Sequence, residues 1–301
     1  MSDVGQAEQA PADPTNSPAD AARYGRWLDL WRALVANQRH AHVAKEGRPT
    51  DPWRDRARDF NTRVRRRLNA PDLHRDFVLA RVDSTMTVLD IGAGTGGWAI
   101  PLARKAGKVT CVEPSEAMRE VLSDNVREFG LTNVEIIAGQ WPGTTVEPHD
   151  VTLCSHAMYA EPDYATFIRA MLAVTRKLAC LVMRLPVTDG VMGLAAQRVF
   201  GHPHDSPNFV VGYNALLELG IYPNVLVEPT LWRPWTSPSL DDALVDIKRR
   251  LGLRGASEHD QWLAALLASR LTLTGDEYVW PAGVRSALAY WEPAVGGGFE
   301  Q

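Results

Sequence analysis

The stretch TVLDIGAGTGGWAIPLA, residues 87–103, decides the fold. An apolar run leads to Asp90, three spaced glycines follow at Gly92, Gly94 and Gly97, and a segment of helical composition comes next. Glycine lets the backbone N–H groups of such a strand–loop–helix turn approach a ligand closely. The stretch therefore predicts a ligand-binding loop at the carboxyl end of a buried strand.

The glycine spacing is compatible with two kinds of ligand. It satisfies the pattern G-x-G-x-x-G, and Glu113 follows about 20 residues later, where dinucleotide-binding proteins hold a ribose hydroxyl. Asp90 favours a different ligand, because a carboxylate beside the loop repels a pyrophosphate and attracts a cation. S-adenosylmethionine has an ammonium and a sulfonium and no phosphate, so it is the ligand we expect. NAD, and with it an NAD-dependent oxidoreductase, remains the alternative.

Short apolar runs alternate with helical segments from Thr87 onward, which predicts an α/β fold. We expect a Rossmann-like, seven-stranded, mostly parallel sheet with helical insertions after the fifth and sixth strands. The expected strands lie in TVLDIG (87–92), KVTCVEP (108–114), VEIIAG (134–139), DVTLCSH (150–156), ACLVMRLP (179–186), NVLVEP (224–229) and VRSALAYW (284–291).

The segment before the sheet divides into two parts. Residues 1–20 are rich in Ala, Pro, Asp and Ser without periodicity, which predicts a disordered tail. Residues 21–70 contain apolar side chains at three- and four-residue spacing, which predicts an N-terminal cap of two amphipathic helices. The periodic residues are Tyr24, Trp27, Leu28, Trp31, Leu34 and Val35, and then Trp53, Ala57, Phe60, Val64 and Leu68.

Composition narrows the functional classes. The chain has 301 residues and a formal net charge of -4, which lacks the positive balance of a general nucleic-acid binder. No apolar run is long enough to span a bilayer, and the first residues lack the pattern of a signal peptide, so we expect a soluble, cytoplasmic protein. Cys111, Cys154 and Cys180 lie in apolar runs and are expected to be reduced and buried. The histidines at 40–42 and 202–205 lack a third or fourth ligand, so no metal site is predicted.

Four motifs resemble those of a known family, the class I S-adenosylmethionine-dependent methyltransferases. VLDIGAGTGG (88–97) looks like the family's first motif, and CVEPSEAM (111–118) is similar to the second. HDVTLCSHAMY (149–159) resembles the fourth, and WRDRARDFN (53–61) looks like the family's Trp-x-x-x-Ala-x-x-Tyr/Phe helix.

The resemblance extends from about Trp53 to about Asp163 through these motifs, and more loosely to Trp291. It implies a methyltransferase domain over residues 71–301, with insertions at about 187–212 and 233–283.

The resemblance also implies how the cofactor is held. Asp90 and the glycine loop would face its methionine part and ribose, Glu113 would hold the ribose hydroxyls, and Phe60 would lie against it. Gln140 occupies the place where many members have an acid that holds the adenine amino group. The implied cofactor contacts are Phe60, Asp90, Gly92, Ala93, Gly94, Glu113, Pro114, Met118, Gln140, Trp141, Ser155 and His156.

The family's reaction is an in-line displacement at a methyl carbon, which chiefly requires alignment and exclusion of water. His156 is the candidate base for a protonated acceptor, and alternatively a substrate-binding or packing residue. Tyr159 is the second candidate catalytic residue, through orientation of the substrate, and it is also a candidate substrate contact. Arg184 would bind a substrate carboxylate or form an ion pair, and Tyr24 and Trp27 are further candidate substrate contacts.

The acceptor is expected to be a small molecule. SHAMY (155–159) lacks the two prolines of the Asn/Asp-Pro-Pro-Tyr motif that methyltransferases of exocyclic amines commonly carry. An RNA or protein methyltransferase that docks through an arginine-rich helix remains an alternative, as does a cofactor-binding protein without catalysis. The arginines concerned are Arg54, Arg56, Arg58, Arg63, Arg65, Arg66 and Arg67.

Overall fold

A computed structural model describes residues 26–42, 51–187 and 189–293 of the chain. The predicted disordered tail (residues 1–20) and Tyr24 lie outside the described residues. Within the described ranges, none of the helices combines the length and the apolar character that crossing a bilayer requires.

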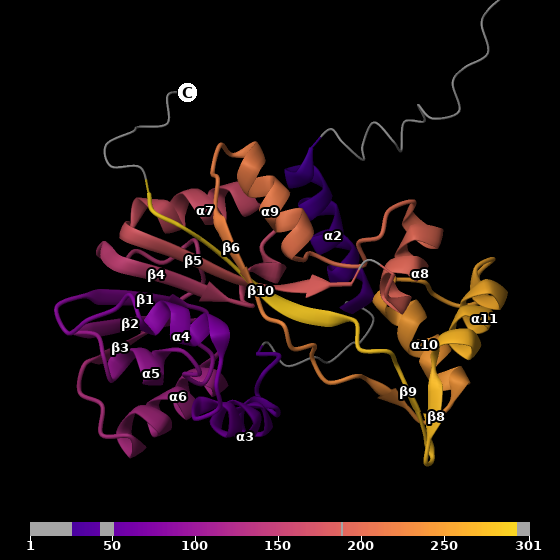
Figure 1. The fold of residues 1–301 in the computed structure, drawn as a ribbon, viewed down its shortest axis with the longest axis horizontal. Coiled ribbons are helices and arrows are strands. Elements are labelled where there is room, and N and C mark those ends of the chain that lie inside the picture. Colours follow the sequence, from indigo (N-terminus) through magenta and orange to yellow (C-terminus); the bar gives the residue numbers. More distant parts are fainter. Residues whose placement is uncertain (1–25, 43–50, 188, 294–301) are drawn as a thin grey trace, which may run out of the picture.

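The centre of the molecule is a seven-stranded sheet in the order β3-β2-β1-β4-β5-β10-β6 (Figure 1). All neighbouring pairs are parallel except the two that β10 forms with β5 and β6. The predicted seven-stranded, mostly parallel sheet is therefore confirmed. The strands are β1 (Thr87–Ile91), β2 (Lys108–Glu113), β3 (Val134–Ala138), β4 (His149–Ser155), β5 (Thr175–Pro186), β6 (Asn224–Val227) and β10 (Val284–Trp291).

Helices cover both faces of the sheet, because alternate residues of each buried strand point to opposite faces. On β1, Leu89 and Ile91 belong to the core shared with α2 (Trp27–His42), α7 (Tyr164–Ala173) and α9 (Phe209–Glu218). Val88 belongs to the opposite core, whose helices are α4 (Leu73–Leu79), α5 (Ala99–Ala103) and α6 (Glu116–Glu128).

The three cysteines divide between these cores, and all are buried and free, as predicted. Burial raises the pKa of the Cys180 thiol to about 12, so it stays protonated and apolar.

The two predicted N-terminal helices are present, but they pack on different parts of the domain. Trp31, Leu34 and Val35 bury one face of α2 against α7 and α9. The second helix, α3 (Ala57–Leu68), buries only Ala57 and packs on α6 (Figure 1). The helix α2 therefore joins the main core, whereas α3 contributes to a small separate cluster.

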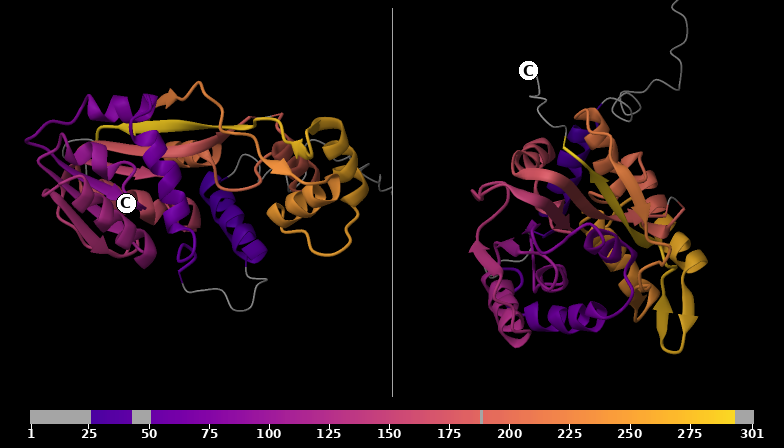
Figure 2. Two further views of the ribbon diagram at one scale, coloured as in Figure 1. Left: turned by 90° about the horizontal axis from the view of Figure 1, so that it is seen from below. Right: turned by 60° about the vertical axis from the view of Figure 1, so that its left-hand side comes forward.

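The segments after β5 and β6 come together in a small unit of their own at one end of the sheet (Figure 2). Its hydrophobic cluster joins α8 (Val191–Phe200) to α10 (Leu240–Arg250) and α11 (Asp260–Arg270). The sequence predicts these helical insertions but not the antiparallel sheet that accompanies them. That sheet consists of β7 (Thr236–Ser237), β9 (Glu277–Val279) and β8 (Thr272–Thr274).

Candidate functional site

The glycine loop after β1 has a backbone that only glycine adopts without strain. Gly92 has φ +71°, and a Cβ atom there would lie 2.2 Å from the Cβ of Ala157, in the turn after β4. Gly94 has φ +56°, and a Cβ there would meet the Phe60 ring at 3.8 Å. The loop therefore runs between the turn after β4 on one side and α3 on the other. Because glycine has no side chain, the backbone at Gly92 and Gly94 stays accessible to a ligand.

Asp90 is buried beneath this loop, at 2% exposure. Its Oδ2 atom has no hydrogen-bond partner among the described residues. Burial first, and the nearby Glu113 carboxylate second, raise the pKa of Asp90 to about 7. A buried carboxylate oxygen without a donor is destabilising unless a cation or donor comes to it, so this atom marks a place for a positively charged ligand group.

Glu113 ends β2, the strand that pairs in parallel with β1. Its Oε2 accepts a hydrogen bond from Gly94 N at 2.8 Å, and its Oε1 accepts one from Ser115 N at 2.9 Å. Asp90 and Glu113 thus lie on neighbouring strand ends, as the sequence predicts. Each Glu113 oxygen retains a second lone pair, so the carboxylate can hold the loop and still accept from ligand hydroxyls.

An apolar wall stands beside Glu113. Trp53 and Phe60 contact edge to face at 5.2 Å between ring centroids, and both pack on the cluster that contains Met118. Asp51, which the sequence analysis missed, ties this wall to α6: its Oδ2 accepts from Ser115 Oγ at 2.8 Å and from Ala117 N at 3.2 Å. No local sequence motif could identify Asp51, because its partner Ser115 lies 64 residues further along the chain.

The remaining predicted cofactor contacts differ in how open they are. Gln140 and Pro114 are exposed and Ser155 is half-buried, so these residues have side-chain surface to offer. Trp141 is 7% exposed in the main core, and its indole N–H donates to Phe167 O at 3.3 Å. Ala93 is 8% exposed and packs in the opposite core.

His156 follows β4 at the sheet edge, in a left-handed backbone conformation with φ +57°. Non-glycine residues adopt this conformation infrequently, and it concentrates at functional turns. The ring has a partner at each nitrogen: Tyr159 OH lies 3.0 Å from Nδ1, and Ser286 Oγ lies 3.4 Å from Nε2. Burial first, and the Arg184 guanidinium second, lower the pKa of His156 to about 4, so its ring is neutral at pH 7.

Tyr159 and Arg184 form one unit beside His156. The Tyr159 hydroxyl accepts from Arg184 N at 2.7 Å, which leaves its own hydrogen for Nδ1 of His156. The Arg184 guanidinium lies 4.7 Å from the Tyr159 ring centroid and donates twice to Pro207 O, at 2.9 and 2.8 Å. Arg184 therefore fastens the segment after α8 to the sheet edge, and its remaining N–H groups are available to an anion.

Tryptophans enclose the same edge. Trp31 of α2 stacks on Tyr159 at 6.5 Å between ring centroids, and the edge of Trp232 meets His156 at 5.4 Å. Trp232 also donates from Nε1 to Ser286 Oγ at 3.1 Å. Trp27, a predicted substrate contact, lies against His204 at 6.2 Å.

Ser286 is a functional candidate that sequence reasoning missed on this side. It reaches His156 from the seventh strand of the main sheet, across a separation of 130 residues. No local spacing reports such a contact.

Two surface cavities lie elsewhere. One, of about 530 Å³, opens at the amino edge of the sheet near Val151, Asn224 and Trp291. The other, of about 590 Å³, lies along α6 near Arg58, Glu120 and Ile136. Neither includes Asp90, Glu113 or His156 among its lining residues.

Comparison with known proteins identifies the domain. The sequence model of a methyltransferase domain matches residues 88–177, from β1 into β5. Over 123 residues the chain is 32% identical to the demethylmenaquinone methyltransferase of Listeria welshimeri, a match that covers 37% of this chain and 51% of the relative. Over 97 residues it is 37% identical to a probable ribosomal RNA small subunit methyltransferase A of Thermococcus kodakarensis, covering 30% and 31%.

The chain thus spans about half, or less, of the length of these two relatives. Among solved structures, a crystal structure of a methyltransferase named as putative, from Bacillus halodurans, aligns with a TM-score of 0.47 at 17% identity. That alignment covers 73% of this chain and 96% of the other.

The residues around the loop fit the family's cofactor. The Asp90 oxygen without a partner can accept a hydrogen bond from an ammonium group. The Gly94 backbone leaves room for the sulfonium nucleoside, and the apolar wall at Trp53 can pack against an adenine ring. Residues 88–177 therefore match a methyltransferase domain, and the residues around the glycine loop fit S-adenosylmethionine, the cofactor that the sequence resemblance implies.

Proposed function

We propose that this protein transfers a methyl group from S-adenosylmethionine to a small-molecule acceptor that has apolar surface. The observation that carries the cofactor half is the buried, unpartnered Oδ2 of Asp90 below the glycine loop. The acceptor half is supported by the aromatic enclosure of His156, in which Tyr159, Trp31 and Trp232 take part. The demethylmenaquinone methyltransferase relative acts, by its name, on an acceptor of this class. We assign the reaction to the cytoplasm, as the composition predicts.

The cofactor brings a methyl group activated by a positively charged sulfur, so the protein chiefly has to align the acceptor and exclude water. In this proposal, Asp90 holds the ammonium and Glu113 holds the ribose hydroxyls. Phe60, with the rest of the apolar wall, holds the adenine ring.

His156 and Tyr159 orient the polar group of the acceptor. Both nitrogens of His156 already have partners, and a pKa of about 4 makes the ring a weak base at pH 7. Because Tyr159 donates to Nδ1, the neutral ring carries its hydrogen on Nε2, which points toward Ser286 Oγ at 3.4 Å, so neither nitrogen has a free lone pair for a proton of the acceptor. The site therefore suits an acceptor atom that has its own lone pair or enters ionised, and Arg184 suits an acceptor with an anionic group.

An RNA acceptor is the second candidate, favoured by the similarity to a ribosomal RNA methyltransferase. Three of the seven arginines that would dock it are engaged within the chain: Arg65 pairs with Glu128, Arg56 lies over Trp53 at 5.1 Å, and Arg63 lies over Phe60 at 5.9 Å. A docking face needs free cations, so this arrangement favours the small molecule.

Calorimetric titration tests the cofactor half. Wild-type protein should bind S-adenosylmethionine and S-adenosylhomocysteine but not NAD. Asp90→Asn should lose at least tenfold in affinity for both, whereas Asp124→Asn on the exposed side of α6 should not. Binding of NAD alone would overturn the proposal.

Isotope transfer tests the acceptor half. The enzyme is incubated with labelled S-adenosylmethionine and a fractionated cell extract, and the label is counted in the small-molecule filtrate, the RNA and the protein. Label in the filtrate supports the proposal. Label in RNA, with binding that falls steeply as salt rises, supports the alternative instead.

A further inference from the structure

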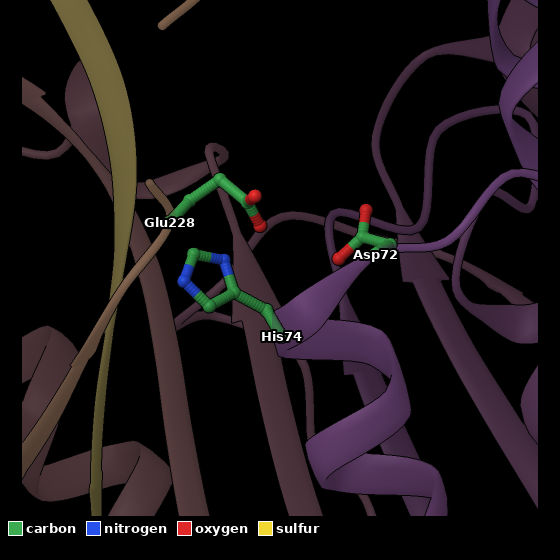
Figure 3. A group of neighbouring side chains, drawn as sticks. All are labelled: Asp72, His74 and Glu228. Carbon is green, nitrogen blue, oxygen red and sulfur yellow. The ribbon is translucent and has the colours of Figure 1, made fainter. Parts of the chain in front are cut away.

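Three side chains outside the cofactor site converge between α4 and β6. Asp72 and His74 lie at the start of α4, and Glu228 directly follows β6 (Figure 3). One ligand atom from each lies within 4.8 Å of the other two. The residues come from segments more than 150 positions apart, so only the fold brings them together.

His74 is fixed in the orientation that a metal ligand needs. The residue is 3% exposed, and its Nε2 donates to Leu226 O at 3.0 Å. Because a carbonyl oxygen can only accept, Nε2 carries the hydrogen, and Nδ1 of the neutral ring has a bare lone pair. Figure 3 shows that one ring nitrogen points toward the carboxylates and the other points away. Burial lowers the pKa of His74, in agreement with a neutral ring, although Asp72 and Glu228 oppose that shift.

The carboxylates of Asp72 and Glu228 add hydrogen-bond acceptors to this cluster but no hydrogen-bond donor. Asp72 Oδ1 caps α4 by accepting from Arg75 N at 3.0 Å, and its Oδ2 lies 3.9 Å from the largely exposed guanidinium of Arg67. Within the part of the chain that the structure describes, the Glu228 carboxylate accepts no hydrogen bond. A lone pair and two anionic groups therefore face one another, with the Arg67 guanidinium 3.9 Å from one of them, which is unfavourable without a further positive charge.

We propose that Asp72, His74 and Glu228 bind a divalent transition-metal ion. One imidazole nitrogen and two carboxylate oxygens form a mixed donor set that suits Zn²⁺ or Mn²⁺ better than Mg²⁺ or Ca²⁺, which prefer oxygen alone. Donors that share one ion at about 2.0–2.2 Å lie roughly 3–4 Å apart, so small side-chain rotations close the site. The hydrogen bond from Nε2 to a backbone carbonyl is the second contact that metal-bound histidines regularly make.

The proposed site lies next to the candidate active site. Glu228 N donates to Ser286 O at 3.0 Å, and Ser286 Oγ is the partner of His156 Nε2. Three protein ligands leave coordination positions for water or an acceptor oxygen, as catalytic metal sites do. The site does not depend on the proposed methyl transfer, because its ligands hold no cofactor group.

Titration of the full chain with the metals alone tests the proposal. Protein treated with a chelator and desalted is titrated calorimetrically with ZnCl₂ and with MnCl₂, and bound metal is counted by elemental analysis after dialysis. We expect one ion per chain and a higher melting temperature with the ion, since binding to the native state stabilises it. Asp72→Asn retains the helix cap and Glu228→Gln retains its shape, and each should weaken binding roughly tenfold or more. Glu258→Gln, an exposed acid in the far unit, is the matched control and should bind as the wild type does.

Three results would overturn the site: no stoichiometric binding of either ion, affinity within threefold of wild type in both variants, or loss of binding in His204→Gln but not in Glu228→Gln. Proton NMR gives an independent readout. The ring signals of His74 should shift or broaden when ZnCl₂ or MnCl₂ is added, and unchanged signals would contradict binding at this cluster.

Discussion

The Glu113 carboxylate at the end of β2 accepts the backbone N–H of Gly94 at 2.8 Å, which couples the second strand to the glycine loop of the first. Its other oxygen accepts from Ser115 N. Glu113→Gln must therefore turn an amide NH₂ toward one of two backbone donors. We expect a loss of about 1–3 kcal/mol in the free energy of unfolding and weaker S-adenosylhomocysteine binding, measured by urea denaturation and calorimetry. Glu135→Gln, on the exposed part of neighbouring β3, serves as the control, and an equal loss there would contradict the coupling.

Asp90 makes cofactor affinity depend on pH. Its pKa in the free protein is raised to about 7, so the carboxylate becomes charged only as the pH passes neutrality. Affinity for S-adenosylmethionine should therefore rise between pH 6 and 8 in the wild type and stay flat in Asp90→Asn. A flat wild-type profile would show that Asp90 does not meet a cation.

The same shift affects the stability of the free protein. A carboxyl whose folded-state pKa lies above its unfolded value of 3.8 binds more protons when folded, so its contribution to stability is present below pH 4 and is lost as pH rises to about 7. The loss is about 4 kcal/mol at most. Thermal melts of wild type and Asp90→Asn across this range should converge at low pH and diverge at high pH.

Gly92 and Gly130 allow backbone strain to be separated from steric collision. Both have positive φ, but a Cβ at Gly92 would meet Ala157 at 2.2 Å, whereas nothing lies within 4 Å of one at Gly130. Gly130→Ala should cost about 1 kcal/mol of unfolding free energy, and Gly92→Ala clearly more, together with loss of cofactor binding. Equal melting temperatures for the two variants would mean that the turn after β4 shifts to make room for the methyl group of Gly92→Ala.

Tyr159 and Tyr164 form a second matched pair. The Tyr159 hydroxyl joins Arg184 N to His156, while that of Tyr164 contacts, among the residues that the structure describes, only Met183 Sδ at 3.9 Å. Tyr159→Phe leaves a backbone N–H and a ring nitrogen without this partner, so it should lower the free energy of unfolding by about 1–3 kcal/mol and change the His156 NMR shifts. Tyr164→Phe should do neither. If the two variants have the same free energy of unfolding and the same His156 NMR shifts, the Tyr159 hydroxyl does not link Arg184 to His156.

The cofactor half of the site could be predicted from sequence because its parts are local. Asp90, the glycine loop and Glu113 belong to one strand–loop–helix–strand unit, so their spacing in the chain sets their spacing in the fold. Asp51 was not predicted, although it contacts the same unit. It lies outside the strand–loop–helix–strand segment, 64 residues before its partner Ser115.

The other half could not be predicted because it is assembled across the sheet. Ser286 reaches His156 only because β10 inserts antiparallel between β5 and β6, which sets Ser286 opposite Arg184. Glu228 reaches His74 for the same reason, through β6. The three-residue strands β8 and β9 are too short, and their sides too exposed, to show an alternation in sequence.

The unit built from α8, α10 and α11 has a hydrophobic cluster separate from the two cores of the sheet. Substitutions in separate clusters affect stability almost independently. Residues around this end of the molecule can therefore change during evolution, or in a selection experiment, while the cofactor-binding strands stay folded. A library confined to residues 191–200 and 240–270 should therefore yield variants whose main sheet stays folded.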